Sequence, residues 1–328
     1  MDCVFILIRS MLMRSLSVVL LCLLSSIWAE AQRKSRILPE PPGCVPVSDN
    51  LYMDEAELAN IHRLEYLHHI RQDSSDAFYR SQIPDSTVWD TNDREIDGHA
   101  SGPFTAYYFR YPGFRYYPLV GVSYEQAVAY CRWRSNMVNA GYFQSAEFQR
   151  KYPELRNFTV LAEYRLPTEA EWEQAAAGGL PIGTEPLQLV PPSSKSSFKP
   201  LQLRKEKALD SCLTALVLPK GKAVFRLPYT LLENFISEKN GQPFFCAAYR
   251  QFFTEYIYNH PPTANKLYNI IGNVAELTAV KGVAKGGSFR SSVRQITVRS
   301  RQLYQGPQSW LGFRCVATVR MVPKTAAR

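Results

Sequence analysis

The stretch that decides the fold is Lys285-Gly286-Gly287-Ser288-Phe289. The block Leu311-Gly312-Phe313-Arg314-Cys315 follows it along the chain. A third block precedes it and reads Asn269-Ile270-Ile271-Gly272-Asn273-Val274-Ala275-Glu276. Further upstream, two capped helix starts lie within residues 120–134 and 165–179. Blocks and helix starts spread in this way indicate that most of the chain forms one folded framework.

The composition is that of a folded, loop-rich protein. The 328 residues are 46 % hydrophobic and 12 % aromatic, which is enough to form a sizeable core and excludes disorder for most of the chain. The 17 glycines and 22 prolines indicate many loops and argue against a helical bundle. No internal repeat and no convincing linker divides the chain, so one large domain is predicted.

The N-terminus has the pattern of an export signal. Arg14 precedes an apolar run over residues 16–28, and Ala29-Glu30-Ala31 offers a cleavage site. The run is shorter than the ~20 apolar residues that span a bilayer, so cleavage is favoured over an uncleaved anchor. We therefore predict a signal peptide at 1–31, a linker at 32–50, a folded domain at 51–323 and a tail at 324–328. The expected location is the periplasm or cell envelope, peripheral to a membrane at most.

The net charge of +9 is unevenly distributed. Residues 281–328 contain ten Lys or Arg and no Asp or Glu. One interpretation is a patch for an anionic envelope glycan. The other, which we favour, is that these basic residues pair with acidic residues elsewhere in the fold; the arginines concerned are Arg290, Arg294, Arg299 and Arg301. No nucleic-acid partner is expected, because no nucleic-acid motif accompanies the charge.

Local patterns predict two helix starts. Ser123 with Gln126 forms one capping box, which begins a helix running from Tyr124 to about residue 136. Thr168 with Glu171 forms the second, and glycines at 178 and 179 end that helix. A third helix is indicated by apolar residues at 61, 64, 67 and 70, with Asp54 as one candidate N-cap. Residues 180–262 give few signals beyond short candidate strands at 213–218 and 223–225.

From about residue 52 to residue 321 the chain resembles the formylglycine-generating enzyme (sulfatase-modifying factor) family. The resemblance is densest at 120–134, 165–179, 268–277 and 286–315. It implies an irregular, loop-rich α+β fold related to C-type lectins. The family pattern also moves the cap of the third helix from Asp54 to Asn60.

Two further segments are similar to the gliding-motility and type IX secretion subgroup of that family. They are Ile83-Pro84-Asp85-Ser86-Thr87-Val88-Trp89 and Tyr108-Phe109-Arg110-Tyr111-Pro112. Members of this subgroup are envelope assembly components rather than oxidases. The resemblance therefore implies envelope protein partners for this chain.

The resemblance also implies a structural calcium ion and a disulfide. The calcium ligands would be the Asn269 side chain, the main-chain carbonyls of Gly272 and Val274, and the Glu276 carboxylate, all hard oxygens of the kind Ca²⁺ prefers. The disulfide would join Cys131 to Cys315. Three other cysteines remain after cleavage. A second disulfide between Cys212 and Cys246 is inferred only from the number of cysteines, and it leaves Cys44 unpaired.

The family's oxidase carries two copper-binding cysteines where this chain has Ser291 and Ile296. Cu(I) prefers soft thiolates, so no copper is expected here, and the retained Ser288 is interpreted as a turn residue. We predict a non-catalytic binding or scaffold module of the cell envelope, with no catalytic residue assigned. The alternative is an oxidoreductase, formylglycine-generating or dependent on a non-haem metal, that acts on a protein or small-molecule thiol through other groups.

Overall fold

The computed structural model describes residues 38–90, 102–179, 237–239, 242–244, 253–259, 262–291 and 298–324. Residues from Glu40 onward belong to one compact unit, and the account below concerns this unit. Several sequence predictions fall outside the described residues. They are the signal peptide, the candidate strands at 213–218 and 223–225, and the residues Cys212, Cys246, Arg294 and Ile296.

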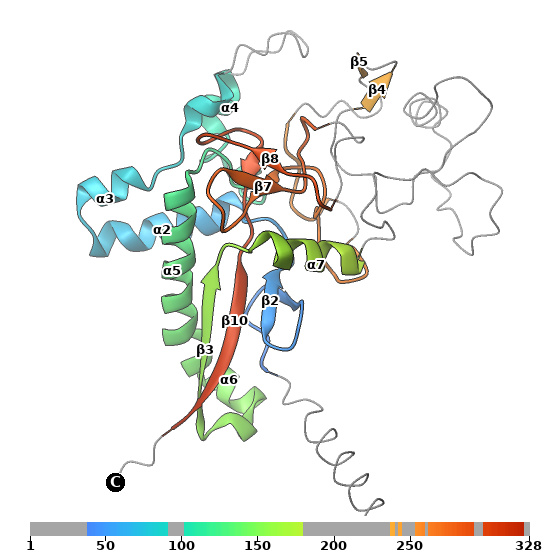
Figure 1. The fold of residues 1–328 in the computed structure, drawn as a ribbon. Coiled ribbons are helices and arrows are strands. Elements are labelled where there is room, and N and C mark those ends of the chain that lie inside the picture. The colour runs from blue at the N-terminus through green and yellow to red at the C-terminus, as the bar shows by residue number, and fades with distance from the viewer. Residues whose placement is uncertain are drawn as a thin grey trace, which may run out of the picture. The chain divides into compact units, whose positions relative to one another are not determined.

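The described chain is a mixture of short helices and short strands (Figure 1). The first half contains β1 (Cys44–Pro46), β2 (Leu51–Asp54), α2 (Asn60–Asp73), α3 (Asp76–Ser81), η1 (Ser86–Trp89), α4 (Gly102–Tyr107), η3 (Pro112–Phe114), α5 (Tyr124–Ala140), η4 (Tyr142–Gln144), α6 (Ala146–Lys151), η5 (Pro153–Leu155), β3 (Phe158–Arg165) and α7 (Glu169–Gly179). The second half contains β4 (Ser237–Lys239), β5 (Gln242–Phe244), β6 (Ala275–Leu277), β7 (Val283–Lys285), β8 (Gln302–Leu303), β9 (Leu311–Gly312) and β10 (Val316–Pro323). The predicted α+β class is confirmed.

An antiparallel sheet of order β1-β2-β10-β3 forms one half of the fold. Its longest pairing joins β10 to β3, with Val316 opposite Arg165 and Pro323 opposite Phe158. Strand β1 falls inside the linker predicted for residues 32–50, so the folded part begins earlier than that boundary. Helix α5 packs alongside β3 (Figure 1), where the Asn139 amide side chain bonds both backbone groups of Ala162.

A second sheet, of order β8-β7-β6-β9, brings the three C-terminal sequence blocks together. The block at 269–276 supplies most of β6. The block at 285–289 starts at the last residue of β7, and the block at 311–315 begins with β9. Strand β6 pairs with β7 antiparallel and with β9 parallel. The order of the motifs along the chain therefore becomes a spatial cluster around β6.

Two buried clusters stabilise the sheets by removing apolar surface from water. One contains Met53, Trp172, Ile270 and Val316, together with neighbours from β1 and α7. The other is rich in aromatic rings; it contains Val88, Trp89, Tyr108, Val120, Val274 and Phe289, with Phe104, Phe114, Tyr117, Phe253 and Trp310 packed at its edge. We call this second group the aromatic cluster.

Both predicted capping boxes are present. The Ser123 hydroxyl accepts from the Gln126 N–H at 3.2 Å, and the Gln126 side chain accepts from the Ser123 N–H at 2.9 Å. Thr168 and Glu171 make the same reciprocal pair before α7.

The start of α2 was predicted incorrectly. Its N-cap is Ala59, whose N–H donates to His62 Nδ1, and Asn60 is already the first helical residue. The Asn60 amide instead donates to the carbonyls of Tyr108 and Phe114. The buried face of α2 also differs from the predicted apolar stripe, because it contains the fully buried Arg63.

Within the part of the chain that is described, no helix has both the length and the apolar character needed to cross a bilayer.

Gly121 provides a direct test of this packing. Its φ is +72°, and a Cβ there would lie 2.3 Å from the carbonyl oxygen of Asp85, the residue that caps η1. We expect Gly121→Ala to destabilise the fold by at least about 2 kcal/mol, because it combines left-handed strain with a backbone clash. Gly306→Ala is the matched control, since nothing lies within 4 Å of its Cβ position. Equal melting temperatures for the two variants would contradict the packing described.

Candidate functional site

The Gly-Gly-Ser turn is built on two glycines with positive φ. Gly286 has φ +89° and Gly287 has φ +70°, a region that disfavours side chains. A Cβ on Gly286 would lie 3.0 Å from the Ile270 carbonyl oxygen and 3.1 Å from the Trp172 ring. The motif therefore has a packing role that is independent of any catalysis.

The two serines of the predicted degenerate site meet in this turn. The Ser288 N–H donates to Ser291 Oγ at 2.9 Å, and the Ser291 N–H donates to the Ser288 carbonyl at 2.8 Å. The Ser288 hydroxyl accepts from the Arg290 N–H at 3.2 Å, and Ser288 is 1 % exposed. Both side chains thus take part in a local turn. Ile296, the second substituted position, lies outside the described residues.

A buried ion pair lies beside the turn. Glu276 Oε1 accepts from Arg314 Nε at 2.7 Å, and Glu276 Oε2 accepts from the Trp172 indole N–H at 2.7 Å. The Arg314 and Glu276 side chains are 0 % and 1 % exposed. Burial is the largest influence on the pKa of Glu276 and raises it, while the Arg314 charge opposes that rise. The sequence showed both residues within motifs but gave no sign of this pairing.

Glu57 is a second buried carboxylate, and the sequence analysis did not identify it as part of the site. Its Oε2 accepts from Asn269 Nδ2 at 3.0 Å and from Asn273 Nδ2 at 2.9 Å. Both asparagines have positive φ, which asparagine tolerates better than most residues. Burial raises the pKa of Glu57 to about 8, although Arg314 and the two amides lower it in part.

These contacts bear on the calcium set implied by the resemblance. Asn269 Oδ1 is buried without a hydrogen-bond partner, as a free ligand oxygen would be. Both Glu276 oxygens, in contrast, are bonded to Arg314 and Trp172, so a cation at Glu276 would compete with the Arg314 guanidinium. The described residues also contain no cluster of three or more His, Cys, Asp or Glu with metal-binding geometry. Calcium stays a prediction.

The described cysteines are all buried. Cys131 and Cys315 approach to 3.4 Å between sulfur atoms, which is a contact rather than a bond, so the disulfide stays a prediction. The Cys44 thiol donates to Asp54 Oδ1 at 3.4 Å. Desolvation raises the pKa of Cys44 and of Cys315 well above the ordinary thiol value. Neither sulfur is thus suited to act as a reactive thiolate.

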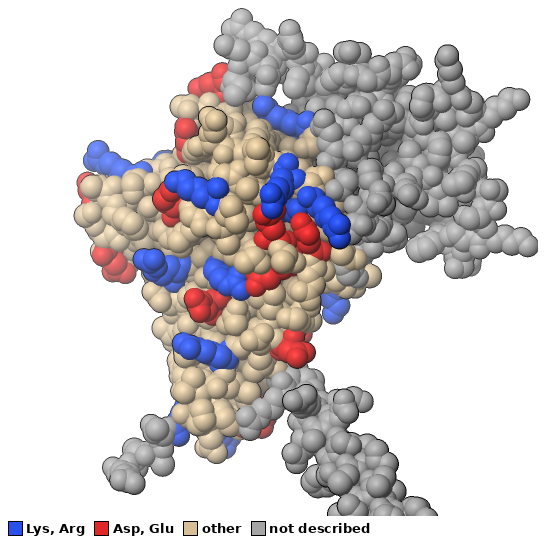
Figure 2. Space-filling model, in the orientation of Figure 1, with Lys and Arg blue, Asp and Glu red and all other residues tan. Residues whose placement is uncertain are grey.

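The basic C-terminal segment is paired in part with acidic residues. Arg301 forms a bidentate ion pair with Glu169, with Nε donating to Oε2 at 2.6 Å and Nη2 donating to Oε1 at 2.8 Å. The pairing interpretation predicted a contact of this kind. Lys281 pairs with Glu125 and Lys285 with Glu173. The face shown in Figure 2 accordingly has blue and red side chains interspersed rather than one basic field.

The model of the "Sulfatase-modifying factor enzyme 1-like domain" family matches residues 49–319, which is most of the chain. The chain belongs to this family. The match contains the Gly-Gly-Ser turn, the Glu276–Arg314 pair and both capping boxes, so these features form the family framework in this protein. Membership in the gliding and type IX subgroup is a finer statement that the match does not make.

No curated protein matches the chain in sequence at a significant level. Solved structures similar to it include PvdO from Pseudomonas aeruginosa, at 17 % identity, TM-score 0.35 and 62 % coverage of this chain. The chain spans 63 % of PvdO. Treponema denticola variable protein 1 matches at 16 % identity and TM-score 0.37, covering 86 % of this chain and 93 % of that one. CarF matches at 16 % identity and TM-score 0.36, with 82 % and 86 % covered.

Calcium can be tested by thermal melting with Ca²⁺ and with a chelator. If the ion binds at this turn, Ca²⁺ raises the melting temperature by mass action, because it binds the folded state only. Asn269→Ala should abolish that increase, since Asn269 Oδ1 is the side-chain oxygen here without a partner. Gln302→Ala, which removes a neighbouring amide that is bonded to the Gly287 N–H, is the control and should keep the increase. Identical wild-type melting in Ca²⁺ and chelator would rule the ion out.

Glu57 should make stability depend on pH. Its folded pKa of about 8 lies above its ordinary value of 4.5, so the folded state retains a proton that the unfolded chain loses. The resulting stabilisation is complete below pH 4.5 and is lost as the pH rises through about 8. We expect wild type to lose about 2–5 kcal/mol relative to Glu57→Gln between those limits.

Chemical denaturation of both proteins across this pH range measures the difference. The control is Glu154→Gln, an exposed glutamate for which the curve should follow that of wild type. A constant difference between wild type and Glu57→Gln across the range would show that Glu57 is not buried as described.

Proposed function

We propose that this chain is an exported, non-catalytic member of its family that serves as a binding or scaffold module in the cell envelope. The observation that carries the proposal is the residue found at the position of a copper-binding cysteine of the family's oxidase. Ser291 stands where the family's oxidase has a copper-binding cysteine, and its oxygen accepts the Ser288 N–H within a turn. A hydroxyl is a poor ligand for Cu(I), and this one is already hydrogen-bonded.

The other sulfur atoms that the structure describes do not replace the missing pair. Cys131 and Cys315 contact each other between α5 and the residue before β10, and Cys44 contacts Asp54. All three are buried. This supports a protein that has kept the family framework while losing the metal-binding thiols.

The envelope role is supported by the sequence. The apolar run at 16–28 followed by Ala29-Glu30-Ala31 favours export, and the two subgroup-like segments favour the gliding or type IX secretion machinery. Those two segments supply Trp89 and Tyr108, whose ring centroids lie 4.7 Å apart in the aromatic cluster. We therefore propose that the partners are envelope proteins.

The proposal predicts no oxidase activity. The purified protein, incubated with a Cys-x-Pro-x-Arg peptide, oxygen and copper, should leave the cysteine unchanged by mass spectrometry. Titration of the folded protein with Cu(I) against a chelator should show no copper binding.

Ser291→Cys combined with Ile296→Cys provides the matched comparison, because it restores both sulfur positions of the family's oxidase. This variant should bind Cu(I) at least about tenfold more tightly than wild type, since thiolates are the preferred ligands. Formylglycine formed by wild type would contradict the proposed function outright.

A further inference from the structure

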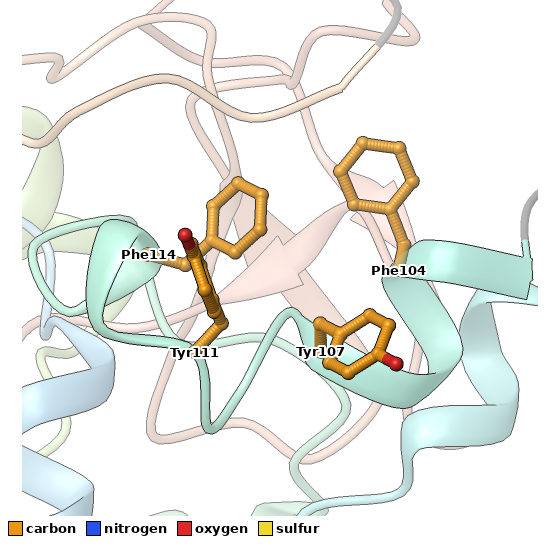
Figure 3. Close-up of a pocket in the computed structure, with 4 residues that line it drawn as sticks. All are labelled: Phe104, Tyr107, Tyr111 and Phe114. Atoms are coloured by element: carbon orange, nitrogen blue, oxygen red, sulfur yellow. The ribbon is translucent and has the colours of Figure 1, made fainter.

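An apolar pocket opens at the surface between α4 and η3 (Figure 3). Its volume is about 280 Å³, and it is lined by Phe104, Tyr107, Tyr111 and Phe114. Tyr107 is 59 % exposed and Tyr111 is 57 % exposed. We call these four residues the aromatic face. Contiguous exposed aromatic surface of this kind marks an interaction site more often than chance.

The aromatic face is held in place from beneath. Phe104 packs on Trp89 with centroids 5.2 Å apart, and Phe114 stacks on Tyr108 at 5.3 Å. Tyr108 is itself fixed, because its hydroxyl donates to the Pro118 carbonyl at 2.6 Å. Pocket walls that are already ordered lose little entropy when a ligand binds, which favours association.

The stretch of chain that forms the aromatic face is basic, although the Asp90 carboxylate accepts a hydrogen bond from the hydroxyl of Thr105, the residue after Phe104. Between residues 102 and 117 there are two arginines, Arg110 and Arg115, and no Asp or Glu. Arg110 immediately precedes Tyr111, and Arg115 immediately follows Phe114. Both arginines are exposed, and neither forms an ion pair with any residue that the structure describes. Arg134, Arg301 and Arg314, in contrast, are all paired with carboxylates.

We propose that the aromatic face docks an acidic segment of a partner protein, which places an apolar side chain in the pocket and carboxylates near Arg110 and Arg115. The pocket, at about 280 Å³, has room for one apolar side chain of a docked segment. Tyrosine and arginine are also the residues that dominate binding energy at protein interfaces. This inference rests on the proposed binding function and specifies its surface.

The test uses two labelled peptides that differ only in charge. One has the sequence Glu-Asp-Leu-Pro-Leu-Asp-Glu and the other Lys-Arg-Leu-Pro-Leu-Arg-Lys. Fluorescence anisotropy with the full-length protein should show the acidic peptide binding at least about tenfold more tightly. That preference should shrink as NaCl rises from ~50 to ~500 mM, because salt screens exposed charges.

Two double variants assign the binding to this surface. Tyr107→Ser with Tyr111→Ser should weaken binding of the acidic peptide by about tenfold or more at any salt concentration. Arg110→Glu with Arg115→Glu should remove the charge preference. The matched controls are Tyr256→Ser and Arg156→Glu, which change an exposed tyrosine and an exposed arginine outside the aromatic face and should bind as wild type. Circular dichroism of each variant confirms that it is folded.

Equal binding of both peptides, or acidic-peptide binding that the Tyr107/Tyr111 variant leaves unchanged, would overturn the inference. So would binding of sugars on a glycan array, in place of the peptides, that is lost in the same variant. None of these results touches the proposed loss of oxidase chemistry, which fails only if wild type forms formylglycine. The two proposals therefore fail by different measurements.

Discussion

The rest of the structure depends on the buried ion pair between Glu276 and Arg314. Arg314 lies between β9 and β10, and Glu276 lies in β6, so their contact joins the end of one sheet to the start of the other. Arg314 also donates to the carbonyls of Asp54 and Tyr268. Loss of either partner would leave a charge without compensation in a water-free interior, which typically costs about 3–5 kcal/mol. Substitution of either Glu276 or Arg314 is therefore expected to be strongly destabilising.

The contacts around the Gly-Gly-Ser turn can be compared with the position of the copper-binding cysteines in the family's oxidase. Apart from Ser291 itself, the groups that pack against or bond the Gly-Gly-Ser turn include the Trp172 ring, the Ile270 carbonyl and the Asn273 carbonyl, which accepts the Phe289 N–H at 2.9 Å. None of these contacts involves the position where the family's oxidase binds copper. A hydroxyl at Ser291 can close the turn by accepting a backbone N–H. The turn and its surrounding contacts therefore form with serine at this position.

The features that sequence predicted well are those decided by near neighbours. A capping box needs two residues three positions apart, and both boxes appeared as expected. The start of α2 was missed because Asn60 found better partners at Tyr108 and Phe114, far along the chain. Arg63 was missed for the same reason: its guanidinium is buried against the carbonyls of Gln82 and Gln126, which no local pattern reveals.

The site shows the same division. Motif resemblance located the three blocks, and it placed Ser288 and Ser291 together in the chain as they are in space. The resemblance could not show that Glu276 forms an ion pair with Arg314, because that pairing depends on the three-dimensional fold, which buries the two side chains together. Glu57 lies more than two hundred residues before Asn269 and Asn273, and a lone glutamate after a strand gives no sign of such partners.

The aromatic cluster connects the framework to the surface where we place binding. Phe289 follows Ser288 directly and belongs to this cluster, while Phe104 and Phe114 pack at its edge and line the pocket. A partner seated on the aromatic face would therefore contact the same packed group that supports the Gly-Gly-Ser turn. Since well-packed interiors have little room to adjust, the framework holds the pocket walls in position.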